Sequence, residues 1–98
     1  MDIISPNKVL QIRYNIPYAH LITVDIDCSK NTNVWIVTDK GLDEFFSDTI
    51  KEVSCYKRSE KTMQHNFSFS PKGDGRWYML ICNTNEEDVY VSYRVVSK

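Results

Sequence analysis

The sequence predicts an all-β protein: an antiparallel β-sandwich of about seven strands, forming a single domain over residues 1–98. Apolar and polar residues alternate with a period of two along most of the chain, which is typical of half-buried strands. The alternating runs are short, and turn-forming residues separate most of them, as in two stacked antiparallel sheets. Only one segment has a helical spacing.

Each expected strand has its own pattern. Residues 10–16 alternate cleanly and stop at Pro17, which has no N–H to donate to a ladder. Residues 77–82, WYMLIC, are apolar on both faces and are expected in mid-sheet, after an Asp-Gly hairpin turn in PKGDG. Residues 51–58 show the weakest alternation. The other strands are expected at residues 22–28, 33–39, 63–70 and 89–95.

The exception to the strand pattern is a short helical turn near residues 41–47. Leu42, Phe45 and Phe46 stand at positions i, i+3 and i+4, which places them on one face of a helix. We expect this turn to cover the core or one open end of the sandwich.

Composition and charge narrow the classes of partner. The chain has 12 basic and 13 acidic residues and a net charge of −1, so it carries no general attraction for nucleic acid or an anionic membrane. The start of the chain lacks the basic and apolar regions of a signal peptide, and no apolar run is long enough to span a bilayer. We therefore expect a soluble, cytoplasmic protein with no nucleic-acid or membrane partner.

Metal ligands form only a weak pattern. Cys28, Cys55 and Cys82 are widely spaced within β-favouring runs, which predicts buried, reduced thiols and not a zinc site or disulfides. Oxygen-bearing side chains recur at alternate positions in DIDCSKNTN, as in a calcium loop, but the glycine and glutamate of an EF-hand are missing. No cofactor is expected. The weak calcium candidates are Asp25, Asp27 and Asn31, in an end of the sandwich that loops near residues 28–33, 58–61 and 83–88 would share.

Catalytic patterns are absent from the sequence. His65 alternates in phase with Met63, Phe67 and Phe69, which indicates a core-face or interface histidine and not a general base. The sequence has no G-x-S-x-G elbow and no phosphate-binding loop. We therefore expect that the protein is not an enzyme.

The C-terminal third carries a family resemblance. The stretch FSFSPKGDGRWYMLICNTNEEDVYVSYRV resembles the closing strands of small β-sandwich modules: the Golgi-dynamics (GOLD) domain, the bacterial pre-peptidase C-terminal domain and a bacterial domain of unknown function joined to TIR domains. NVWIVTDKGLDEFFSDT resembles the strand and short helix of the TIR-joined type. The resemblance implies a non-catalytic module for recognition or assembly, in a bacterial or phage conflict or signalling system. It transfers no binding residue.

The leading functional prediction is therefore an accessory module that binds a protein partner or forms a homo-oligomer. The strand at 77–82 has more apolar surface than one core face needs, so its second face must be covered by the helical turn, another part of the chain or a partner. The candidate partner-binding residues are Trp77, Tyr78, Met79, Leu80, Trp35 and Tyr90. The alternatives are a β-sandwich that binds calcium or a small ligand, the latter in a pocket lined by Trp35, Tyr56 and Tyr78, and, third, a hydrolase.

Overall fold

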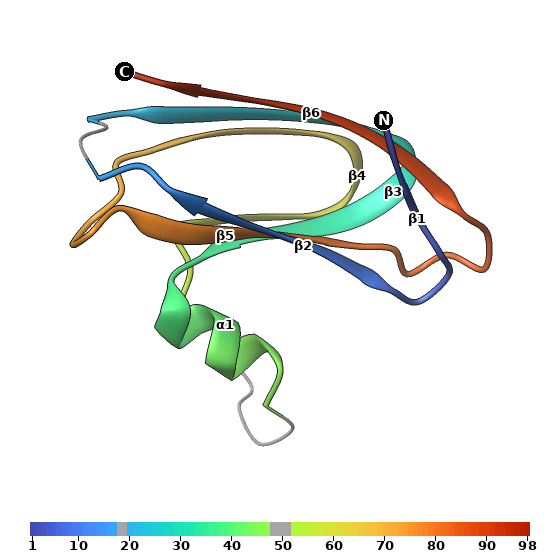
Figure 1. Ribbon diagram of the computed structural model, residues 1–98. Helices are drawn as coiled ribbons and strands as arrows, with labels where there is room; N and C mark the ends of the chain where they lie inside the picture. Colours follow the sequence, from blue (N-terminus) through green and yellow to red (C-terminus); the bar gives the residue numbers. More distant parts are fainter. Residues whose placement is uncertain (18–19, 48–51) are drawn as a thin grey trace.

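The computed structural model describes residues 1–17, 20–47 and 52–98, which form one antiparallel sheet with a short helix (Figure 1). The elements are β1 (Asp2–Ile4), β2 (Val9–Asn15), β3 (Ile22–Val37), α1 (Asp39–Phe45), β4 (Lys57–Phe69), β5 (Arg76–Cys82) and β6 (Val89–Ser97). The strand order is β1-β6-β3-β5-β2, and β4 pairs with the other edge of β3. The all-β antiparallel class is confirmed. A sandwich of two separate sheets is not, because the strands belong to one continuous sheet.

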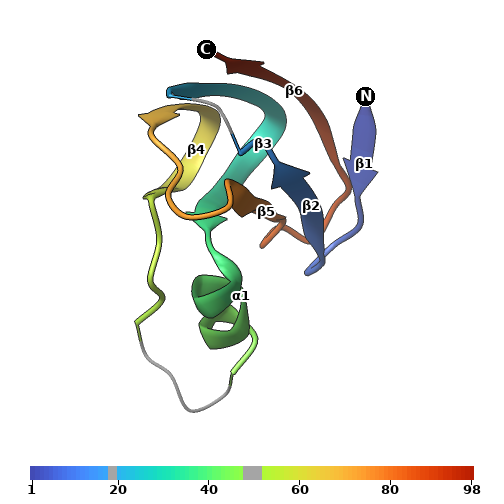
Figure 2. The same cartoon turned by 60° about the vertical axis from the view of Figure 1, so that its left-hand side comes forward.

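The shape of the sheet comes from the bend of β3 and β4. The first half of β3 pairs with β6 and its second half with β5, while β4 follows it along the opposite edge. The register between β3 and β4 shifts between Asp27 and Thr32 and again between Thr32 and Val34, and such irregularities let a strand turn sharply. Both strands therefore fold back on themselves, and the sheet curves into a half-barrel (Figures 1 and 2).

The concave side of the half-barrel holds the main core. Trp77 of β5 lies at its centre, with Phe69 edge-on at 5.0 Å and Tyr14 stacked at 4.3 Å between ring centroids. The core-facing residues of the central strands are fully buried: Ile22, Val24, Ile26, Val34, Ile36, Met79 and Ile81. A second, smaller cluster lies on the convex side, where α1 covers β5 and the end of β3.

The strand boundaries differ from the predicted ones in several places, and the strand predicted at 63–70 begins six residues earlier, since β4 spans Lys57–Phe69. Residues 22–28 and 33–39 are not two strands, because β3 runs from Ile22 to Val37 without a turn and Asp39 already belongs to α1. Within the predicted strand at 51–58, only Lys57 and Arg58 are strand, and Lys51 lies outside the described residues. Ser54 there donates its N–H to Glu44 of α1 at 3.0 Å, and Val53 packs on the cluster under α1, so these two residues pack along the helix. Tyr56 already donates its N–H to Ile36 of β3 at 2.7 Å. The sequence pattern also missed β1, which is only three residues long.

The predicted helical turn is confirmed as α1. Leu42 and Phe45 pack on the second cluster, whereas Phe46 is 58% exposed because it lies at the C-cap, beyond the helical face. Cys55 is exposed, contrary to the prediction of three buried thiols, because its segment is not a strand. In the described part of the chain, no helix is long and apolar enough to cross a membrane.

The turn before β5 is present, but it is not a hairpin turn. It links β4 to β5, which do not pair with each other. Gly75 has a φ of +77°, and a Cβ there would lie 2.5 Å from the carbonyl oxygen of Ile16, so glycine is required on both grounds. The Gly75 carbonyl accepts the N–H of Ile16 at 3.0 Å, which ties the turn to the end of β2. The predicted mid-sheet place of β5 is confirmed, since it lies between β3 and β2.

Candidate interaction surface

Both faces of β5 are covered by the chain itself. Trp77 and Met79 point into the main core, and Tyr78 and Leu80 point toward α1, where Leu80 is fully buried. The Tyr78 hydroxyl donates to Asp39 at 2.6 Å, and this hydrogen bond, followed by burial, raises the pKa of Tyr78. These four candidate residues therefore present almost no surface to a partner in this structure.

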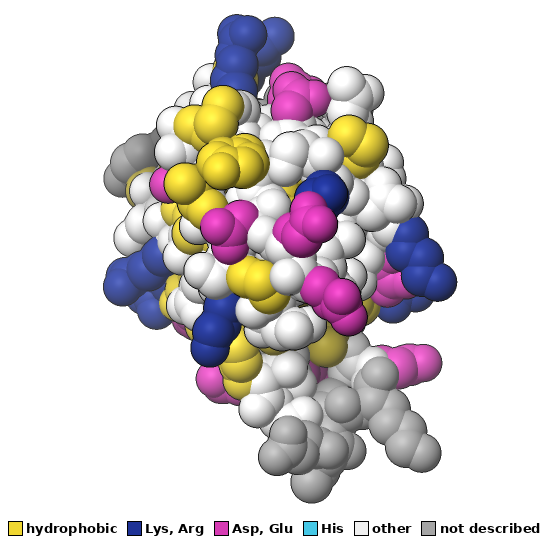
Figure 3. Space-filling model, turned by 90° about the vertical axis from the view of Figure 1, so that its right-hand side faces the viewer, with side chains coloured by type: hydrophobic (Ala, Val, Ile, Leu, Met, Phe, Trp, Pro, Cys, Tyr) yellow, Lys and Arg dark blue, Asp and Glu magenta, His cyan; other side chains and the backbone are white. Residues whose placement is uncertain are grey.

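The other two candidates keep exposed surface. Trp35 is partly exposed on the convex side, where the Arg58 guanidinium lies 5.3 Å from its ring centroid. Tyr90 is 48% exposed on β6, directly opposite Ile3 of β1 in register. Met1, Ile3 and Tyr90 are all exposed, and we call these three side chains the β1–β6 patch. On the face of the molecule that carries β1, hydrophobic side chains gather at one side, next to acidic ones (Figure 3).

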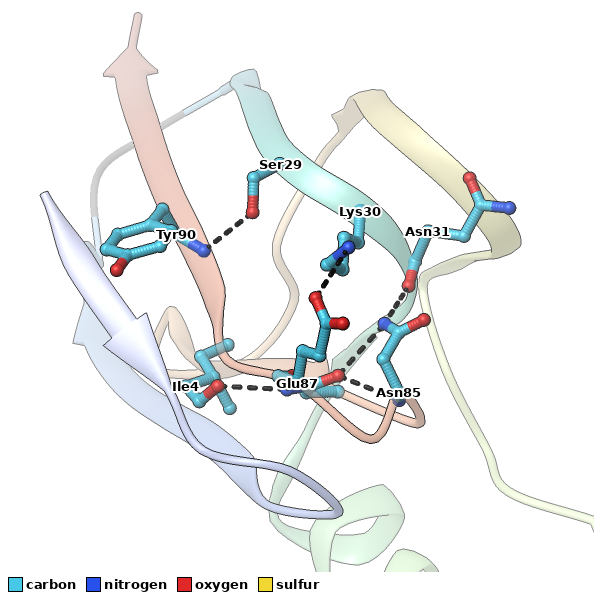
Figure 4. Close-up of polar contacts among 8 residues, drawn as sticks. Ile4, Ser29, Lys30, Asn31, Asn85, Glu87 and Tyr90 are labelled. Carbon is cyan, nitrogen blue, oxygen red and sulfur yellow. Dashed lines mark hydrogen bonds and ion pairs between the residues drawn. The ribbon is translucent and has the colours of Figure 1, made fainter.

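A hydrogen-bonded loop between β5 and β6 holds the β1–β6 patch in place (Figure 4). The buried Asn83 amide donates to the carbonyl oxygens of Ile4 at 2.9 Å and Glu87 at 2.8 Å. Asn85 donates to the Asn31 carbonyl at 2.8 Å, and Glu87 pairs with Lys30 at 3.0 Å. The loop is thus bound to β1 and to the bend of β3, so the patch rests on a fixed support.

The half-barrel remains open between β2 and β6. Core-facing side chains on the central strands are fully buried, but those on β2 and on the second half of β6 are only partly covered. We call this opening the seam. Its lining residues are Leu10, Ile12, Tyr14 and Ile16 of β2 and Tyr93 and Val95 of β6.

The hydroxyls of Tyr14 and Tyr93 are polar groups among the described lining residues of the seam, and the Asp2 carboxylate lies beside Tyr93. Burial raises the pKa of Tyr14, and the nearby Tyr93 raises it further. The pKa of Tyr93 is raised by burial and by its contact with Asp2. A hollow of about 460 Å³, lined by Met1, Asp2, Val91, Ser92 and Tyr93, lies where β1 leaves the edge of β6. Apart from the Asp2 carboxylate, the described side chains that line the seam and this hollow carry hydroxyls or are apolar.

A buried polar group lies at the bend of β3 and β4, which the sequence pattern did not predict. The Thr32 hydroxyl is 2.8 Å from Nε2 of His65 and donates to Sγ of Cys28 at 3.2 Å. The prediction of a core-face histidine is confirmed, since His65 is 1% exposed. Burial raises the pKa of the Cys28 thiol, which therefore stays protonated and is a poor nucleophile.

The calcium candidates are spread along β3 and its bend, where Asp27 and Asn31 line one hollow together with Lys61. Asp25 and Asp27 lie on the convex face of β3, opposite Arg94 and Ser92 of β6, while Asn31 lies in the bend. Among residues 1–17, 20–47 and 52–98, no group of three or more His, Cys, Asp or Glu side chains could hold a metal ion. The loops at 28–33 and 83–88 do meet, but through the Asn85–Asn31 hydrogen bond and the Lys30–Glu87 ion pair.

The aromatic pocket suggested by the sequence is not formed. Tyr56 stacks on Phe69 in the main core, whereas Tyr78 and Trp35 both belong to the smaller cluster under α1, so the three rings do not line one pocket. Trp35 instead lines a groove of about 330 Å³ together with Phe45 of α1 and residues near the start of β2. The partial exposure of residues 10–16 also could not be predicted, because their alternation is the same as that of a fully covered strand.

The sequence matches no protein-family model and no curated protein. The functional interpretation therefore depends on the β1–β6 patch and the seam.

Proposed function

We propose that this chain is a non-catalytic module for protein recognition or self-assembly, as the resemblance to small β-sandwich modules also implies. The observation that supports it best is the β1–β6 patch. Ile3 is 59% exposed at the outermost strand of the sheet, beside Tyr90. Exposed apolar side chains that adjoin one another on a fixed support are typical of protein-interaction sites.

Two further features support an interaction role over catalysis. Of the six candidate partner-binding residues, Tyr90 belongs to this patch. The cysteine and histidine at the bend are buried, and their thiol and imidazole favour the uncharged forms. A nucleophile and base pair needs the opposite arrangement, an accessible and activated thiolate.

The substitution Ile3→Lys tests the proposal. The Ile3 side chain is exposed, so the free energy of unfolding of the variant should differ from that of the native protein by less than about 0.5 kcal/mol. A lysine there would place a charge inside any contact made by the patch, and we expect at least about a tenfold loss of affinity, which corresponds to about 1.4 kcal/mol. Sedimentation velocity over a range of concentrations measures self-assembly. A pull-down with the immobilised chain measures the binding of partner proteins.

The matched control is Met63→Lys, which places the same charge at an apolar side chain that is 46% exposed on β4. Native protein and the control should associate alike, and only Ile3→Lys should lose association. The proposal fails if the native protein stays monomeric at every concentration and Ile3→Lys captures the same proteins as the native chain.

A further inference from the structure

The second half of β6 has an unpaired edge at the seam. Lys98 and Leu21 exchange backbone hydrogen bonds of 2.9 and 3.2 Å, so the peptide groups of even-numbered β6 residues face β3. The peptide groups of odd-numbered residues face the other way. Those of Val89 and Val91 meet β1, whereas β1 does not reach Tyr93 and Val95. The N–H and C=O groups of Tyr93 and Val95 therefore point into the seam.

The same reasoning gives the free edge of β2. Asn83 donates its N–H to the carbonyl of Lys8 at 3.0 Å, and Ile16 donates to Gly75, so even-numbered β2 residues face β5. The odd-numbered residues Gln11 and Arg13 therefore turn their peptide groups toward the seam.

These two edges are compatible with one inserted strand. β6 and β2 run in the same direction across the seam (Figure 1), so a single strand of opposite direction is antiparallel to both. Directly opposite residues of an antiparallel pair have side chains on the same face. Residues that pair with Tyr93 and Val95 would thus point into the core, and those that pair with Gln11 and Arg13 would point outward. This alternation is what one strand supplies.

We propose that the seam accepts one extended strand of another protein, with apolar side chains at alternate positions and acidic side chains between them. The apolar residues would cover Leu10, Ile12 and Val95, which the chain leaves partly exposed. The inserted strand would also continue the ladder that β1 begins on β6. This inference rests on the proposed recognition function and names its partner chemistry, namely β-strand addition.

The outward face of the seam selects the charge of the partner. Arg13 of β2 and Arg94 of β6 flank the opening on this face. In the described residues neither forms an ion pair, although Arg94 has Asp25 of β3 opposite it in register, so Arg13 carries the less balanced charge. Acidic side chains of an inserted strand would lie opposite them, and such cross-strand pairs are favourable.

A synthetic peptide of alternating valine and glutamate, labelled with fluorescein, provides the probe. Fluorescence anisotropy with the full chain should show binding at least tenfold tighter than for a peptide with valine replaced by serine. A third peptide, methylated on every second backbone nitrogen, keeps the side chains but loses hydrogen bonds to one edge, and should also bind at least tenfold more weakly. A peptide with lysine in place of glutamate should bind the chain more weakly than the valine–glutamate peptide.

Protein variants test the same site independently. Arg13→Glu should weaken binding of the valine–glutamate peptide at least threefold, whereas Lys72→Glu, an exposed position outside the seam, should not. Bound peptide should slow hydrogen exchange at the amides of Tyr93, Val95, Gln11 and Arg13. Since these amides belong to the native chain, this readout does not depend on the folding of any variant.

The proposal is overturned if the valine–glutamate peptide does not bind or if N-methylation does not change its affinity. The same holds if the bound peptide slows hydrogen exchange only at amides outside these four. It is also overturned if the native protein forms a dimer whose interface protects the same four amides, because the occupant is then a second copy. The Ile3 side chain lies on the opposite face of the sheet from the seam lining, so an effect of Ile3→Lys without peptide binding removes this inference alone.

Discussion

His65 links a single residue to the pH dependence of stability. Its Nε2 is 2.8 Å from the Thr32 hydroxyl, and its buried Nδ1 has no hydrogen-bond partner in the part of the chain that the structure describes. Burial lowers the pKa of His65 below its ordinary value of 6.5, although the Thr62 backbone acts in the opposite direction. The unfolded chain therefore binds a proton at a higher pH than the folded one.

We expect the native protein to lose stability as the pH falls below about 6.5, the ordinary histidine value, toward the lower pKa of the folded state. The substitution His65→Gln should remove this part of the dependence, at a cost of about 1–3 kcal/mol at pH 7.5 from the lost buried contacts. Urea unfolding of both proteins at pH 7.5, 6.5 and 5.5 measures the difference. Equal slopes of unfolding free energy against pH for the two proteins would contradict this account.

At the scale of elements, α1 is a cover for the convex face of β5. Phe45 packs edge-on against Trp35 at 6.1 Å, while its neighbour Phe46 is mostly exposed at the end of the helix. The two phenylalanines are therefore a matched pair in which the same substitution removes different amounts of buried surface.

Phe45→Ala should destabilise the protein by about 2 kcal/mol, somewhat below the value for a fully buried phenylalanine, because Phe45 is only half-buried. Phe46→Ala should change the free energy of unfolding by less than about 1 kcal/mol. Thermal or urea unfolding followed by circular dichroism measures both. If the two variants are equally stable, α1 does not depend on its contact with Trp35.

The elements also show what the sequence can and cannot predict. Strict alternation identified most of the strands, and the i, i+3, i+4 spacing identified α1. The same alternation could not reveal that β3 continues through residues 28–33. The register shifts there, so the strand bends and continues, whereas the sequence pattern of this polar stretch is the same as that of a loop between two strands. Residues 51–58 were misassigned because Val53 packs on α1 in an irregular segment.

At the scale of the whole molecule, core-facing side chains are fully buried in the centre of the half-barrel but only partly buried at its two edges, on β2 and on the second half of β6. Whether core-facing side chains are covered depends on which strands become neighbours, and periodicity does not contain that information. The seam could therefore not be predicted, although every residue that lines it was placed on a core face by the pattern of residues 10–16 and 89–95.

Hydrogen exchange should show the open edges directly. In the free protein, the amides of Gln11 and Arg13 should exchange faster than those of Leu10 and Ile12, which face β5. Two-dimensional NMR in deuterated buffer resolves these neighbours, which share one strand and similar local structure. Equal protection along β2 would mean that its outer edge is covered.

The long strand β3 also bears on how this protein reaches its folded form during synthesis. It is the shared partner of β4, β5 and β6, and its first residue, Ile22, pairs with Ser97. Half of this strand therefore lacks one neighbour until the ribosome has made and released β6. Contacts so distant in sequence slow folding. During that interval the apolar residues Val24 and Ile26 are incompletely covered, so this part of the nascent chain is most exposed to aggregation just before β6 docks.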